Sequence, residues 1–72
     1  MFNRDTVIHL IGDPCLNLYR AMGKGYWYFK FDDGALSGTK AVLVKSLNDL
    51  PLDTWVSEGR TFAAEMRAKH KR

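Results

Sequence analysis

The chain has 72 residues, of which 46% are hydrophobic and 26% are charged, and its net charge is +3. This length allows one domain at most, and the composition is that of a globular protein rather than a disordered one. Cys15 is the one cysteine, so no internal disulfide can form, which favours a reducing, cytoplasmic setting. No apolar run approaches the roughly 20 residues that cross a bilayer, and residues 1–15 do not resemble a signal peptide.

The positive charge is concentrated at the C-terminal end. Residues 1–66 hold seven Lys or Arg and eight Asp or Glu, a net charge of −1, and residues 67–72 add four cations. We therefore expect one near-neutral compact domain over residues 1–66 and a basic helix end or tail over residues 67–72. The four cations of the tail are Arg67, Lys69, Lys71 and Arg72.

The first part of the chain predicts two strands separated by a turn. Residues 6–11 are β-branched and apolar, which predicts a strand, and residues 12–14 (GDP) predict a turn. The alternation in residues 16–20 predicts a second strand. Residues 23–25 (GKG) then predict a tight hairpin connection, because glycine accepts a positive φ angle.

Residues 26–31 (YWYFKF) predict the clearest strand. Its side chains alternate between two faces, and we expect the apolar face to be the core. The core face carries Trp27, Phe29 and Phe31, and the outward face carries Tyr26, Tyr28 and Lys30. A loop is expected up to about Gly38. Residues 40–45 predict the last strand, and either of its faces could be buried.

The C-terminal part predicts one amphipathic helix. Residues 46–51 form a connection, with Leu47 and Leu50 expected to be buried beneath it, and from residue 52 to residue 69 the apolar period becomes 3.6. The fold class is therefore α+β, a three- to four-stranded antiparallel sheet with one helix packed on one face. The apolar stripe of the helix is Leu52, Trp55, Val56, Gly59, Phe62, Ala63 and Met66. The expected core is Trp27, Phe29, Phe31, Trp55, Phe62 and Met66.

Gly59 lies in the middle of this stripe, where glycine costs about 1 kcal/mol relative to alanine. We expect a close approach of the helix backbone to the sheet to compensate for that cost, beneath a ring such as that of Trp27. A leucine at position 59 is then predicted to force the helix away from the sheet.

No residue pattern predicts catalysis, a metal or a cofactor. His9, Cys15 and His70 are too scattered for a zinc site. His9 is expected in a strand, and Cys15 is expected to be a buried thiol, since no activating neighbour is evident. Residues 23–25 lie between two strands, so a hairpin explains them better than a phosphate loop does. We expect neither an enzyme nor a small-molecule substrate.

Two features favour a binding function. The outward set Tyr26, Tyr28 and Lys30, flanked by Lys24, combines aromatic rings with cations, as platforms that stack nucleic-acid bases do. The same residue types form hot spots for protein partners, and a second layer or a dimer partner could also cover them. The basic tail can contact phosphates, or it can be a solvated helix end.

Two resemblances bear on this hypothesis. The order strand-strand-strand-helix with an aromatic sheet resembles the three-stranded DNA-binding domains of phage-type integrases and plant AP2 factors. In those families the sheet lies in the major groove, but their domains are strongly basic, unlike residues 1–66. The resemblance implies a DNA-facing surface of Arg20, Lys24, Tyr26, Tyr28, Lys30 and Lys45.

Residues 25–29 (GYWYF) and 47–56 (LNDLPLDTWV) resemble a pattern in short uncharacterised proteins of bacterial prophages and other mobile elements, over roughly residues 16–66. This implies a bacterial, cytoplasmic accessory protein, and it implies no activity or site. The sequence hypothesis is a non-catalytic module that binds nucleic acid through the tail and the Tyr26/Tyr28/Lys30 face. The alternative is a protein–protein module that uses the same face, either an inhibitor of a host complex or a homodimer.

Overall fold

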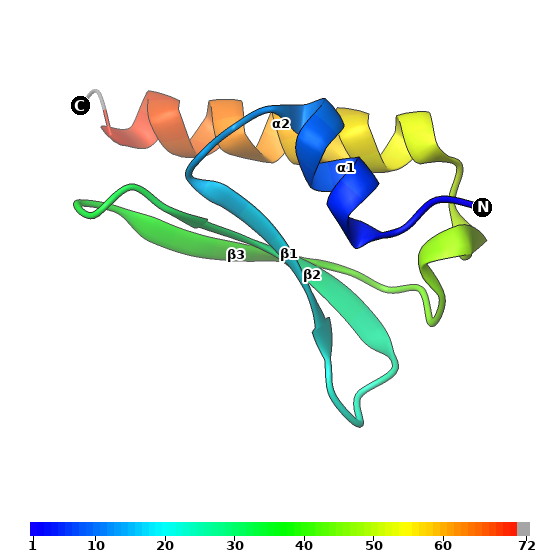
Figure 1. Ribbon diagram of the computed structural model, residues 1–72. Helices are drawn as coiled ribbons and strands as arrows, with labels where there is room; N and C mark the ends of the chain where they lie inside the picture. Colours follow the sequence, from blue (N-terminus) through cyan, green and yellow to red (C-terminus); the bar gives the residue numbers. More distant parts are fainter. Residues whose placement is uncertain (71–72) are drawn as a thin grey trace.

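The described part of the chain forms a three-stranded antiparallel sheet with two helices on one of its faces (Figure 1). The computed structural model describes residues 1–70, and the side chains of residues 1–69. The predicted α+β class, with a long C-terminal helix on the sheet, is confirmed. In chain order the elements are α1 (Arg4–Ile11), β1 (Leu16–Ala21), β2 (Tyr26–Asp32), β3 (Ser37–Val42), the 3₁₀ turn η1 (Leu47–Asp49) and α2 (Leu52–His70).

The sheet has the order β1-β2-β3, and both of its connections are hairpins. Leu18 lies opposite Phe29, and Phe29 lies opposite Lys40. Gly23 and Gly25 have φ angles of 74° and 73°, which L side chains rarely adopt, so the glycines predicted for the first hairpin are required there. The strand predictions for residues 16–20 and 26–31 are confirmed.

The predicted first strand, residues 6–11, is wrong, because this segment is the helix α1. Asn3 caps its N-terminus, where the Asn3 side chain accepts a hydrogen bond from the Thr6 backbone N–H at 3.0 Å. Gly12 ends the helix with a φ angle of 72°, and its N–H donates to the Ile8 carbonyl. The caps and the i,i+4 burial of Val7 and Ile11 outweigh the β propensity of the segment.

The last strand begins and ends three residues earlier than predicted. The Asp33 side chain accepts from the backbone N–H groups of Ala35 and Leu36, at 2.9 and 2.8 Å, and this closes a short turn before Ser37. Gly38, predicted to lie in the loop, is part of β3. A Cβ atom there would lie 2.8 Å from Cε of Met66, so glycine allows α2 to approach the strand closely.

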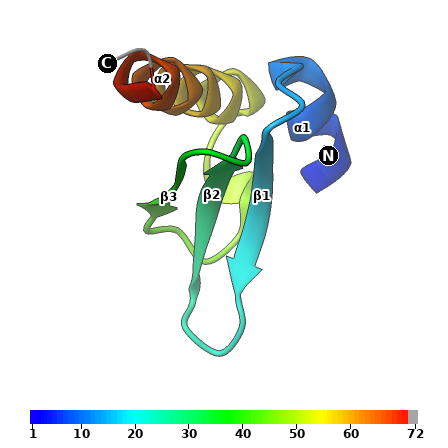
Figure 2. The ribbon, with the colours of Figure 1, turned by 90° about the vertical axis from the view of Figure 1, so that its left-hand side faces the viewer.

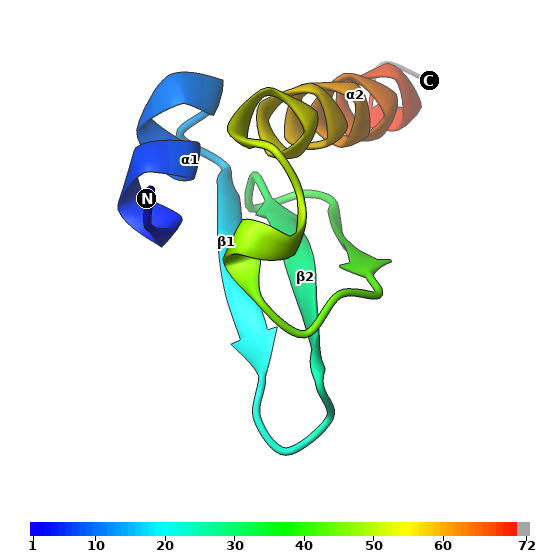
Figure 3. The same cartoon turned by 90° about the vertical axis from the view of Figure 1, so that its right-hand side faces the viewer.

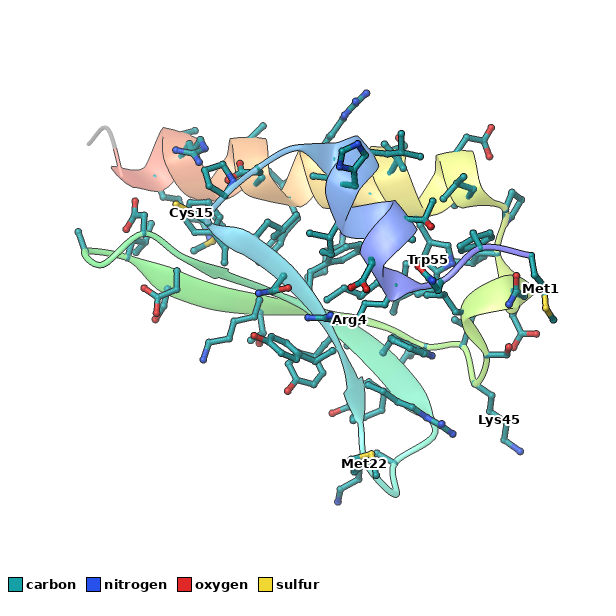
Figure 4. All side chains as sticks on the ribbon, in the orientation of Figure 1. Met1, Arg4, Cys15, Met22, Lys45 and Trp55 are labelled. Carbon is teal, nitrogen blue, oxygen red and sulfur yellow. The ribbon has the colours of Figure 1, made fainter. Side chains whose placement is uncertain are left out.

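The core fills the space between the helices and the sheet. Of the six core residues predicted from the sequence, Trp27 is partly buried and the other five are buried. The Trp27 ring packs edge-on against the Trp55 ring, with the two ring centroids 6.3 Å apart. Val7, Ile11, Leu16, Leu18, Leu47 and Ala63 complete the main cluster. Figure 4 shows Trp55 directed from α2 toward the sheet.

In the part of the chain that the structure describes, two helices cover the core face, each over a different part of the sheet. Figure 2 shows α1 above β1 and α2, seen along its axis, above β2 and β3. Figure 3 shows η1 below the N-terminal end of α2. Leu47 of η1 is buried, and Leu50 is partly buried, as expected for this connection.

Candidate functional site

The opposite face of the sheet, which we call the open face, is not covered by any element in the described part of the chain (Figures 1 and 2). In an antiparallel pair, directly opposed residues share a face, so the strand register assigns the side chains to each side. Residues on the open face are Asn17, Tyr19 and Ala21 of β1, Tyr26, Tyr28, Lys30 and Asp32 of β2, and Ser37, Thr39 and Ala41 of β3.

Three side chains in contact with one another lie on the β1 side of the open face. The rings of Tyr19 and Tyr28 lie 5.6 Å apart with an interplanar angle of 34°. The guanidinium of Arg4 lies over the Tyr19 ring, 5.5 Å from its centroid. Arg4, Tyr19 and Tyr28 therefore form one continuous row, which we call the Arg4–Tyr19–Tyr28 row.

Arg4 is fixed in this position by the edge of the sheet. Its Nε atom donates to the Leu18 carbonyl, and an Nη atom donates to the Asn17 side chain at 2.9 Å. It also forms an ion pair with Asp5 at 3.2 Å. The sequence prediction missed Arg4 because residues 6–11 were assigned to a strand. Asn3, a favourable N-cap residue three positions before Thr6, is the signal that could have revealed α1 and thus the position of Arg4.

The predicted sheet-face residues lie where the sequence predicted them. Tyr26 and Tyr28 are half-buried, and Lys30 is exposed beside them on β2. Lys24 is exposed in the β1–β2 turn, at the end of the hairpin that projects away from the helices in Figure 1.

Two residues implied by the DNA-binding resemblance lie elsewhere. Arg20 is opposite Trp27, on the core side of the sheet, and not beside Tyr28. Lys45 follows β3, and its carbonyl accepts a hydrogen bond from the Trp27 indole at 3.3 Å. Arg20 and Lys45 are both exposed but do not extend the open face.

The predicted basic tail is partly helix and partly outside the described residues. Arg67 and Lys69 belong to α2, whose layer lies on the side of the sheet away from the open face. Lys71 and Arg72 lie outside the described residues. The structure therefore does not bring the described tail cations together with Tyr28 and Lys30.

Arg67 is held by the loop between α1 and β1. Its guanidinium donates to both carboxylate oxygens of Asp13, at 3.1 and 2.7 Å, and lies 5.3 Å from the centre of the Phe31 ring. The hydrogen bond from Arg67 lowers the pKa of Asp13, and it outweighs the opposing effect of burial. Arg67 thus joins the C-terminal half of α2 to the start of the sheet.

We expect Asp13→Asn to lower the melting temperature at pH 7 by about 2–6 °C, because the two-point ion pair with Arg67 is lost. The folded-state pKa of Asp13 is depressed, so its contribution is present above its unfolded pKa and is lost as the pH falls through the folded pKa. The stability difference between the two proteins should therefore be constant above about pH 5 and shrink below about pH 4. Urea unfolding at several pH values measures this difference in the free energy of unfolding. Equal stability of the two proteins at pH 7 would contradict a stabilising role for the Asp13–Arg67 ion pair.

Among the described residues, the remaining side chains that could act in catalysis or bind a metal do not come together in one site. His9 is exposed in the last turn of α1, not in a strand, and Cys15 is half-buried, not fully buried. Among the described residues there is no group of three or more His, Cys, Asp or Glu that could hold a metal ion. In the same part of the chain, no helix has both the length and the apolar character needed to cross a membrane.

Comparison with known proteins gives no relative. No family model matches the chain, and neither a curated protein nor a solved structure is significantly similar to it.

Proposed function

We propose that this protein is a non-catalytic binding module that contacts nucleic acid through the open face of its sheet. The observation that supports this most is the Arg4–Tyr19–Tyr28 row on an uncovered face, with Lys30 beside it. Aromatic rings on a sheet can stack on bases, and neighbouring cations can contact phosphates.

The charges on the open face are compatible with a polyanion. Lys30 and Lys24 are exposed at the face and at its hairpin end. Asp32 is at the far end of β2, where its side chain accepts a hydrogen bond from the Gly34 backbone N–H at 2.9 Å. The tail is a second cationic region, to which Lys69, Lys71 and Arg72 contribute more than Arg67 does, because Arg67 is already paired with Asp13. The resemblance of residues 25–29 and 47–56 to mobile-element proteins suggests a bacterial accessory protein as the context.

A salt-dependent titration tests this proposal. Fluorescence anisotropy with labelled single-stranded and duplex DNA and RNA would be measured at about 50 and 200 mM salt. We expect the double variant Lys24→Gln/Lys30→Gln to bind about 3–10-fold more weakly and to show a shallower salt dependence. The matched control, Arg20→Gln/Lys45→Gln, removes the same charge away from the open face and should bind within about twofold of the wild type. No binding by the wild type at low salt would refute the function.

A protein partner is the second candidate, and a different observation favours it. Strand β3 is at an edge of the sheet, and Leu43, directly after it, has 82% of its surface exposed. Exposed edge strands can pair with another chain. Association through this edge should depend little on salt and should be weakened by Leu43→Asp. Light scattering coupled to gel filtration would detect self-association, and a monomer at all concentrations would exclude the homodimer.

A further inference from the structure

We propose that the open face takes a single strand of nucleic acid rather than a duplex, with one unpaired base stacked on Tyr28 on the side of β3. This inference rests on the proposed function and specifies its ligand. It follows from the shape of the face on the two sides of the Tyr28 ring.

On the β1 side, the Tyr28 ring is already occupied. Tyr19 lies opposite Tyr28 in the strand register, with their ring centroids 5.6 Å apart, and the Arg4 guanidinium lies over the Tyr19 ring. No base can therefore enter between Tyr28 and β1 without displacing this row.

On the β3 side, the residues that lie opposite β2 have small side chains. Ala41 is opposite Tyr28, Thr39 is opposite Lys30, and Ser37 is opposite Asp32. Opposed side chains in a sheet stand about 5 Å apart and roughly perpendicular to it. Beside the tall Tyr28 ring there is thus a strip of small side chains, which we call the β3 shelf (Ser37, Thr39 and Ala41). A base on this shelf would extend the Arg4–Tyr19–Tyr28 row by one more layer.

A ring in this position requires an unpaired base, because the bases of a duplex are stacked on one another and present only their edges in the grooves. The net charge of the compact domain points the same way. Duplex binding commonly uses many phosphate contacts, whereas residues 1–66 carry a net charge of −1. Arg4 is engaged by Leu18, Asn17 and Asp5. Among the described residues, Lys30 on the open face and Lys24 in the adjoining turn are therefore the cations that we assign to phosphates.

Three variants test the position of the base. Tyr28→Ala removes the ring, and Tyr28→Phe keeps the ring and removes only the hydroxyl. Ala41→Ile fills the β3 shelf with a good strand former that offers no aromatic surface. Each variant would first be shown to melt cooperatively, because Tyr28 is half-buried.

The probes are a fluorescein-labelled 12-nucleotide oligothymidine and a labelled 12-base-pair duplex, at about 50 mM salt. We expect the wild type to bind the single strand about tenfold or more tightly than the duplex, and the two phosphate contacts of Lys24 and Lys30 to contribute about −1 to −2 to the salt slope. Loss of one base–ring stack should weaken single-strand binding about tenfold in Tyr28→Ala and several-fold in Ala41→Ile. Tyr28→Phe should remain within about twofold of the wild type.

The two levels of the proposal fail in different ways. Equal or tighter binding of the duplex, or unchanged single-strand binding by a folded Tyr28→Ala, would overturn the single-strand inference and leave nucleic-acid binding in place. Absence of binding to both probes would overturn the proposed function itself.

Discussion

Replacing Gly59 with leucine is expected to destabilise the protein by about 1–3 kcal/mol and to lower its melting temperature by about 10 °C. A Cβ atom at this position would lie 2.3 Å from Cδ1 of Ile11 and 3.1 Å from Cε1 of Phe29. The close approach expected from the sequence is thus present, but it involves Ile11 of α1 and the Phe29 ring, and not the Trp27 ring. The added side chain must push α2 away from both neighbours, and the gain in helix propensity is too small to offset that. Thermal unfolding followed by circular dichroism measures the effect.

Ala64→Leu is the matched control, because Ala64 is exposed on the same helix, and its melting temperature should change little. A double-mutant cycle identifies the contact more sharply. Ile11→Val removes the Cδ1 atom that a Cβ at position 59 would meet, so Ile11→Val and Gly59→Ala should be less destabilising together than the sum of the two single changes. Strict additivity would show that α1 does not limit the space at Gly59.

Replacing Trp55 with alanine is expected to cost about 3–5 kcal/mol, which is most of the stability that a domain of this size can have. Trp55 is fully buried, and its ring packs edge-on against the Phe29 ring, with the two ring centroids 5.9 Å apart. Its indole N–H donates to the Leu47 carbonyl at 2.6 Å, which fixes η1 to the first turns of α2. We expect Trp55→Ala to lose its cooperative unfolding transition, as measured by urea titration with far-ultraviolet circular dichroism.

Trp55→Phe should keep a transition and lose about 1–3 kcal/mol, because the Leu47 carbonyl is left without its buried donor. Trp27→Phe provides the comparison. Trp27 donates in the same way to the Lys45 carbonyl, at 3.3 Å, but that hydrogen bond is exposed. Its loss should therefore cost less than about 1 kcal/mol. A larger loss in Trp27→Phe than in Trp55→Phe would contradict the ranking of the two contacts.

The fold could be predicted from the sequence where a hydrophobic pattern ran over many residues, and where a turn needed the positive φ angle that glycine accepts. The helical stripe from Leu52 to Met66 and the alternation in residues 26–31 each gave the correct element and face. The short segment of residues 6–11 was assigned incorrectly because its β-branched residues suggest a strand, whereas local capping and contact with α2 decide its conformation. Gly38 was assigned to a loop because its packing beneath Met66 depends on a tertiary contact that no local pattern contains.

The candidate site was predictable only where a local pattern determines it. The alternation of β2 placed Tyr26, Tyr28 and Lys30 on the outward face. Tyr19 and Arg4 join Tyr28 through strand pairing and through the packing of α1, which depend on the assembled sheet. The pairing of Arg67 with Asp13 connects residues 54 positions apart, so the sequence showed a cation there but not its partner.

The Asp13–Arg67 pair also affects how the tail should be tested. Deleting residues 67–72 would remove the four cations of the tail and, at the same time, the contact that joins α2 to the α1–β1 loop. Replacing Lys69, Lys71 and Arg72 with glutamine, while keeping Arg67, separates the two effects. A loss of affinity in that variant without a loss of stability would assign the tail a direct role.

The position of α2 at the end of the element order has a consequence for synthesis of the protein on the ribosome. The two hairpins of the sheet are local and can form as soon as β3 has emerged, but Trp55, Phe62 and Met66 come last. Until then the apolar face around Phe29 and Phe31 is without its main cover. The nascent chain is therefore expected to expose an apolar surface from the time β3 has emerged until α2 has also emerged and packed on the sheet, and in that interval a chaperone would be able to recognise it.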